Sequence, residues 1–208
     1  MNQIVLAGMD GKTITMIIVL VVVAVLIAIG IGIVVWGIKK ANALRRQMVK
    51  IKEAASDIDV ALTKRFDLLS KQYDICKGYA KHENGTLIDV AKMRSGLSEA
   101  KASDGAVDMK KASANNAAMD KLSTNINIIV ERYPELKANT LFISLSNSCS
   151  DVEEHLQASR RLYNSNVSIY NQEIVVFPSS IIAHMIHAMP ADFFEAEEAK
   201  KQDVKMEF

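Results

Sequence analysis

The sequence is poor in residues that interrupt helices. Its 208 residues include three prolines, of which the first is Pro134, and no glycine occurs between Gly37 and Gly78. Aromatic residues make up only 6% of the chain, and good helix formers dominate the rest. A β-sandwich or barrel needs frequent turns and many aromatic and β-branched side chains. The composition therefore favours an all-α protein.

The sequence also has little net charge and few cysteines. The formal net charge is +1, which argues against a nucleic-acid-binding protein, because such a protein normally presents a basic field to phosphates. The two cysteines, Cys76 and Cys149, match no metal-binding or redox spacing and fall on predicted apolar faces. We expect two reduced core thiols, in a reducing compartment, rather than a disulfide framework.

Motifs that carry catalytic chemistry are missing. The sequence contains no G-x-S-x-G, no Walker A and no H-E-x-x-H motif. A di-iron bundle needs inward-facing Glu-x-x-His pairs, and none of the four histidines has a glutamate three residues earlier. His184 and His187 are i,i+3 neighbours, but no carboxylate precedes them at helical spacing. We therefore predict no catalytic, metal-binding or cofactor-binding residue, and no enzyme.

The longest feature present is an uncharged apolar run, ITMIIVLVVVAVLIAIGIGIVVWGI, over residues 14–38. About 20 apolar helical residues span a hydrocarbon core, so the run is long enough with some tilt. It is too long for a signal-peptide core, and no small-residue cleavage site follows it. Residues 14–38 therefore predict a retained transmembrane helix. A small-residue ridge on it, which would allow homo-oligomers, consists of Ala24, Ala28 and Gly32.

The flanks of this run predict its orientation. Lys12 before it is offset by Asp10, whereas six basic residues and no acidic one follow between Lys39 and Lys52. By the positive-inside rule, residues 1–13 lie outside and the rest lies in the cytoplasm of a bacterial inner membrane. The basic cluster is either a simple stop-transfer flank or a contact for anionic headgroups. The predicted membrane-interface residues are Trp36, Lys39, Lys40, Arg45 and Arg46.

Four helices are expected after the span, over residues 39–82, 86–102, 106–131 and 134–176. The first of these helices carries an apolar stripe, with apolar residues three or four positions apart. The first and the last helix are nearly equal in length, ~65 Å each at ~1.5 Å per residue. Up-down-up-down connection gives an elongated antiparallel four-helix bundle over 39–190, a long helical hairpin plus two shorter helices. A short helix within 180–189, which Pro190 stops, then lies at the bilayer surface or under the bundle. Residues 191–208 form an acidic-leaning, frayed tail.

Polar side chains beside the two long stripes suggest a partly buried network. Arg65 flanks the stripe of the first helix, and the last helix offers two asparagines seven residues apart on one face. Interhelical hydrogen bonds between these sets would fix the register of the hairpin. The alternative is a pair of solvated flanks whose ion pairs contribute little. The predicted set, with Arg160 nearby, is Asp59, Arg65, Asp67, Arg161, Asn164 and Asn171.

Several stretches together resemble the LemA family of bacterial membrane proteins. They occur in the family's order: DIDVALTKRFDLL (57–69), KGYAKHE (77–83), YPELKAN (133–139), RRLYNSNVSIYNQEIVVFPSSIIA (160–183) and FFEA (193–196). The family usually has a tyrosine where this chain has Ala41, a tryptophan where it has Ala55, and Pro-Asn where it has Ser70-Lys71. The resemblance implies an amino-terminal membrane helix and a cytoplasmic helical bundle, and it implies no reaction.

These features together predict a non-enzymatic scaffold at the cytoplasmic face of the membrane. Its expected partners are the lipid bilayer and unidentified proteins, with no nucleic acid and no cofactor. A bundle with charge-patterned faces can recruit partners without a deep pocket. The competing hypothesis is a signalling bundle that transmits membrane or oligomeric state, which requires two packings of similar free energy.

Overall fold

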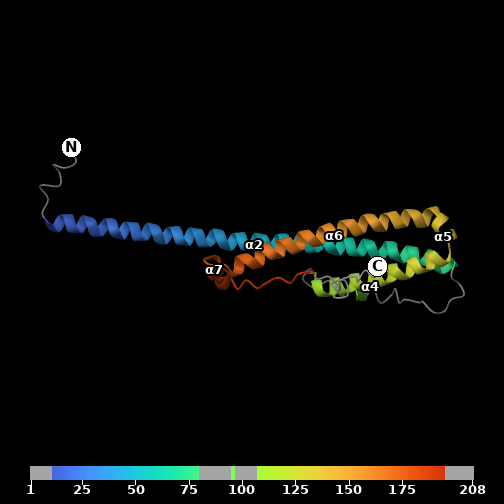
Figure 1. Ribbon diagram of the computed structural model, residues 1–208. Coiled ribbons are helices and arrows are strands. Elements are labelled where there is room, and N and C mark those ends of the chain that lie inside the picture. The colour runs from blue at the N-terminus through green and yellow to red at the C-terminus, as the bar shows by residue number, and fades with distance from the viewer. Residues whose placement is uncertain (1–10, 80–94, 97–106, 195–208) are drawn as a thin grey trace, which may run out of the picture.

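The computed structural model describes residues 11–79, 95–96 and 107–194. Within these ranges the chain is helical and contains no strand, which confirms the all-α prediction. The molecule is a long rod: one helix runs its whole length, and the others lie along its carboxy-terminal half (Figure 1). The elements in chain order are α2 (Gly11–Tyr79), α4 (Met109–Arg132), α5 (Glu135–Ala138), α6 (Thr140–Val175) and α7 (Ser179–Met185).

Helix α2 continues without a break from the apolar run into the bundle. Its 69 residues contain no proline, so nothing in the backbone forces a kink at the end of the run. The apolar side chains of residues 16–35 are all exposed, for example Leu20 at 60% and Ile33 at 63%. Among the described residues, α2 is the one helix long and apolar enough to cross a membrane.

The second half of α2 packs against α6 in an antiparallel hairpin. Lys40 pairs with Glu173 near one end, and the thiol of Cys149 lies 3.5 Å from Gln72 Oε1 toward the other. The apolar stripe predicted on the first helix is buried from Ile51 to Cys76, as its 3/4 spacing requires. The facing residues of α6 that share this core are Leu156, Tyr163, Val167, Tyr170 and Ile174.

Helix α4 lies along α2 and covers a further side of this core. It begins at Met109, not at Ala106 as predicted. The reason is local: the Asp108 carboxylate accepts hydrogen bonds from the N–H groups of Lys110 and Lys111, at 3.0 and 3.2 Å. The helix predicted over 86–102 lies, apart from residues 95–96, outside the described residues. The four-helix count therefore stays a prediction.

The helix predicted over 134–176 is divided at Asn139, so the prediction of one continuous helix is wrong. Asn139 ends α5, and its side chain accepts the N–H of Phe142 at 3.1 Å to begin α6. An asparagine competes for its own backbone in this way, which makes it a better cap than a helix-interior residue. The chain therefore turns at Asn139 before starting back along α2.

The short helix and the tail also differ from expectation. Helix α7 ends at Met185, before Pro190, and His187 adopts a positive φ of 53° just after it. The tail is not frayed throughout: residues 191–194 follow α6 in an extended path, with Phe194 only 5% exposed. We call residues 191–194 the carboxy-terminal strap. Residues 195–208 lie outside the described part of the chain.

Candidate functional site

A polar centre links three helices inside the bundle. The side chain of Arg65 on α2 is 9% exposed. Its guanidinium donates to Asp120 Oδ1 of α4 at 2.7 Å and lies 3.0 Å from Glu153 Oε2 of α6. It also donates to the side-chain oxygen of Asn116 on α4. A buried guanidinium is stable only when partners of this kind surround it. The centre therefore fixes how α2, α4 and α6 are aligned.

A second arginine borders this centre. Burial lowers the pKa of Arg160, while the carboxylates of Glu153 and Asp120 oppose that shift. Its guanidinium lies 4.8 Å from the ring centre of Phe194 in the strap. This distance allows a cation–π contact. Arg160 therefore connects the polar centre to the last described residue of the chain.

The structure distributes the predicted polar set over different places. Arg65 is buried in the polar centre, and Asp59 is also buried on α2. Asp67 and Arg161 are exposed. Asn164 and Asn171 bond to the strap and not to α2, the partner that their spacing predicts. The partners of Arg65 that sequence reasoning missed, Asn116, Asp120 and Glu153, carry no local signal, because tertiary packing alone brings them together.

Two asparagines of α6 hold the backbone of the strap. Asn171 donates to Ala191 O and accepts from Ala191 N, both at 2.9 Å. Asn164 does the same for Phe194, at 3.0 and 2.9 Å. Seven helical residues rise about 10.5 Å and three extended residues about 10 Å, so the two spacings match. The sequence shows the seven-residue spacing of the two asparagines, but it does not show that the strap is what they bind.

A tyrosine adds a third contact between α6 and the strap. The hydroxyl of Tyr163 donates to the carbonyl oxygen of Asp192 at 2.8 Å. Burial, with a contribution from the Asp192 carboxylate, raises the pKa of Tyr163 to about 12. The phenol is therefore a neutral hydrogen-bond donor at physiological pH. Together with the two asparagines, Tyr163 holds the strap against α6.

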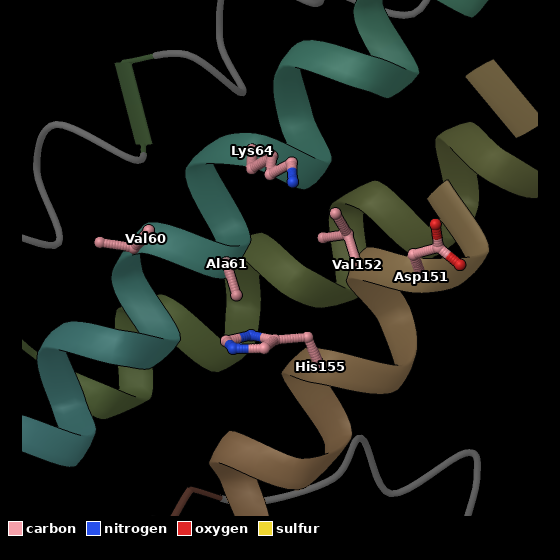
Figure 2. Close-up of a pocket in the computed structure, with 6 residues that line it drawn as sticks. All are labelled: Val60, Ala61, Lys64, Asp151, Val152 and His155. Carbon is pink, nitrogen blue, oxygen red and sulfur yellow. The ribbon is translucent and has the colours of Figure 1, made fainter. Parts of the chain in front are cut away.

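A surface hollow lies between α2 and α6 on the bundle (Figure 2). We call it the α2–α6 hollow; it has a volume of about 350 Å³. Its floor is apolar, because Ala61 and Val152 are buried. Its rim carries both signs of charge, so it suits an apolar side chain with polar neighbours. The lining residues are Val60, Ala61, Lys64, Asp151, Val152 and His155.

Two ionisable side chains on the rim of the hollow, His155 and Asp151, point in different directions. Figure 2 shows the imidazole of His155 directed toward Ala61 and the carboxylate of Asp151 pointing away from it. A general acid or base must lie within hydrogen-bond reach of the proton that it transfers. No sequence pattern indicates this hollow, because its residues meet only after the hairpin forms.

Metal-ligating and nucleophilic groups are dispersed in the described ranges. No three His, Cys, Asp or Glu side chains gather there in a way that could hold a metal ion. Both cysteines are free, and Cys76 is fully buried. Burial raises the pKa of Cys76 to about 11 and also raises that of Cys149. These thiols stay protonated at neutral pH, and a protonated thiol is a poor nucleophile.

The predicted membrane-interface residues form a collar around α2. Trp36, Lys39, Arg45 and Arg46 are exposed, whereas Lys40 is half-buried and donates to Glu173 at 2.6 Å. This hydrogen bond lowers the pKa of Glu173 below its ordinary value. The collar therefore lies where the bare part of α2 meets the bundle.

A family model and a curated protein both match this chain. A family model described as the LemA family matches residues 54–208. The curated Protein LemA of Metamycoplasma hominis is 30% identical over 169 residues, which cover 80% of this chain and 74% of that protein. The family match includes the polar centre, the α2–α6 hollow and the strap, and it begins beyond the apolar run.

Proposed function

Because this chain belongs to the LemA family, we propose that it is a membrane-anchored helical scaffold without enzymatic activity. The observation that carries the proposal is helix α2, which is apolar and uncovered in its first half and packed into a bundle in its second. A helix bare of protein on every side over such a length is stable where lipid surrounds it. The bundle would then present its surface to partners beside the membrane.

The collar supports a cytoplasmic bundle in this proposal. Lys39, Arg45 and Arg46 are exposed immediately after the apolar run. Basic residues next to a span are retained on the cytoplasmic side. The protein would cross the inner membrane of a bacterium once, with residues 1–13 outside and the bundle inside.

The α2–α6 hollow supports an interaction role. It offers an apolar floor and a charged rim on an exposed part of the hairpin, about halfway along it. Such a surface accepts one or two anchoring side chains of a partner helix. The polar centre, whose Arg65 directly follows Lys64 on α2, would keep the two walls of the hollow in fixed register.

Photocrosslinking in intact cells tests the scaffold. A photoreactive residue replaces Lys64 at the rim of the hollow, and in a matched variant it replaces Lys71, exposed on the same helix but outside the hollow. We expect a protein crosslink at position 64 that Val60→Arg abolishes. Val49→Arg, at a residue as exposed as Val60, leaves it intact. Crosslinks of equal yield at both positions, or to lipid alone, contradict recruitment through the hollow.

The anchor is tested separately by topology. We expect the protein to stay in the membrane pellet after an alkaline wash, and a protease added outside intact cells to leave residues beyond Lys39 uncut. Release by the wash contradicts the span. Digestion of the bundle from outside contradicts the orientation.

The continuity of α2 favours a second candidate, a signalling bundle. An unbroken helix passes tilt or rotation of the apolar half directly to the packed half. A signalling bundle needs a second packing of similar free energy. Hydrogen exchange separates the two candidates: α2 amides opening well below global unfolding indicate signalling, whereas one cooperative unit indicates a scaffold.

A further inference from the structure

The chain exposes large apolar side chains where it turns from α6 into α7. Val175 is 70% exposed, Phe177 76% and Met185 70%. Isolated exposed apolar residues are ordinary on a protein surface, but a contiguous group marks a contact. We call this group the α6–α7 corner, and it consists of Val175, Val176, Phe177, Ile181 and Met185.

Helix α7 divides into two faces at this corner. Ser179 and Ala183, four residues apart, are buried against the bundle. Ile181 and Met185, also four residues apart, are exposed. Residues four apart share a helix face, so α7 presents one apolar face to the bundle's surroundings. An apolar environment other than the core of the bundle would have to cover this exposed face of α7.

The corner lies beside the end of the apolar run of α2. The side chain of Ile182 approaches Gly37 so closely that a Cβ added there would stand 3.3 Å from Ile182 Cδ1. The Lys40–Glu173 pair, at 2.6 Å, ties the end of α6 to the same level. Figure 1 shows α7 next to α2 where the hairpin begins.

The length of the apolar run places this level in the interfacial layer. Residues 14–38 rise about 37 Å at about 1.5 Å per residue. A hydrocarbon core is about 30 Å thick, with headgroup regions on either side. The last turns of the run, including Gly37, therefore reach the boundary between acyl chains and headgroups. Any segment that touches Gly37 is at the same depth.

We propose that the α6–α7 corner inserts into the interfacial layer of the bilayer, next to the span, as a second lipid contact of the protein. This inference depends on the proposed membrane anchor. Lipid is the occupant because the corner continues the bare surface of α2, which the same lipid would cover. The exposed basic side chain of Lys39 stands at the level of the headgroups, and the exposed Arg45 and Arg46 follow it about 9 and 10.5 Å further along α2.

A single tryptophan reporter tests the insertion. Trp36 is the one tryptophan of the chain, so Trp36→Phe combined with Phe177→Trp moves the reporter to the corner. The full-length protein is reconstituted into phosphatidylcholine–phosphatidylglycerol vesicles whose acyl chains carry bromine, a short-range quencher. We expect the tryptophan at position 177 to lose most of its emission. Val176→Trp in the same background, at a neighbouring exposed position, should behave alike and guards against one disruptive substitution.

Two references separate this inference from the anchor. The unaltered protein reports from Trp36 beside the span, and Trp36→Phe with Leu141→Trp reports from an exposed position at the far end of α6. We expect quenching of Trp36 and none at position 141. Quenching of Trp36 with none at positions 176 and 177 overturns the corner and leaves the anchor intact. No quenching at Trp36 overturns both.

A second copy of the chain is the other possible cover for the corner. In that case the tryptophan at position 177 is protected from a water-soluble quencher but unaffected by brominated lipid. The protection also falls as the protein is diluted in the membrane. That result overturns the proposal, because it assigns the corner to a dimer.

Discussion

The two halves of α2 are continuous in backbone and opposite in environment. From Met16 to Ile38 the large apolar side chains are exposed on every face, and from Leu44 onward a single stripe is buried under α4 and α6. Both halves are rich in apolar residues. What distinguishes them is periodicity: an all-round apolar surface suits lipid, and a 3/4 stripe suits a protein partner in water.

The comparison shows where stability against denaturant must reside. A side chain contributes to bundle stability through the protein surface it covers, and side chains of the bare half cover none. Substitutions of the same type on the two halves should therefore differ in their effect. The difference between buried and exposed positions should be largest for the arginine of the polar centre and smallest for the ion pair at the border between the two halves.

The largest effect is expected at the polar centre. Arg65→Ala removes the buried guanidinium that pairs with Asp120 and Glu153, and it should lower the free energy of unfolding by about 4 kcal/mol. Urea unfolding of the detergent-solubilised chain, followed by circular dichroism, measures it. Arg46→Ala, at an exposed residue of the same helix, should cost under about 0.5 kcal/mol. Equal losses would contradict a buried role for Arg65.

The next effect compares two leucines of the same helix. Leu62 is 1% exposed and Leu20 is 60% exposed. Leu62→Ala should destabilise the bundle by about 3 kcal/mol, since it removes buried contacts and leaves a cavity. Leu20→Ala should leave the urea midpoint unchanged. A shift of the midpoint by Leu20→Ala would mean that the bare half packs against protein.

A smaller effect is expected at the strap. Asn164→Ala removes both hydrogen bonds to Phe194 and should cost about 1–3 kcal/mol. It should also release Phe194 to chymotrypsin, which limited proteolysis detects as faster cleavage near the carboxy terminus. Asn147→Ala, at an exposed position of α6, should leave the cleavage rate unchanged. Unaltered cleavage in Asn164→Ala would show that the asparagine does not hold the strap.

The smallest effect is expected at the border between the two halves. Lys40 holds the pKa of Glu173 below its ordinary value. The pair therefore stabilises the bundle above the unfolded pKa of about 4.3, and its contribution is lost as the pH falls through the lower folded pKa. Glu173→Gln should cost under about 1 kcal/mol at pH 7 and nothing in strong acid. Urea midpoints at both pH values measure this, with the exposed Glu154→Gln as control.

The features that depend on one helix at a time were predictable from the sequence. The 3/4 spacing of apolar residues predicts the buried stripe of α2 from Ile51 to Cys76. The length of the uncharged apolar run predicts a helix long enough to cross a membrane. The antiparallel return also follows, because two long helices of similar length must share a core. The Lys40–Glu173 pair bears this out by joining the start of the hairpin to its end.

Features decided by competition or by distant contacts were not predictable. Asn139 is tolerated within a helix, so only the bond from Phe142 N to its side chain shows that it caps one. The sequence predicts that Asn171 bonds to the neighbouring helix. In the structure its partner is Ala191, in an extended segment twenty residues later, and no sequence pattern indicates that contact. The α2–α6 hollow likewise depends on which turns of two helices meet.

The unbroken backbone of α2 has a mechanical consequence. About 40 residues beyond the apolar run rise about 60 Å, so in the proposed membrane-anchored protein the far end of the bundle would move like the tip of a lever pivoted at the bilayer. A change in tilt of about 10°, well within the range that spanning helices adopt, swings that tip sideways by about 10 Å. In that arrangement, a change in bilayer thickness would displace the far end of the bundle sideways.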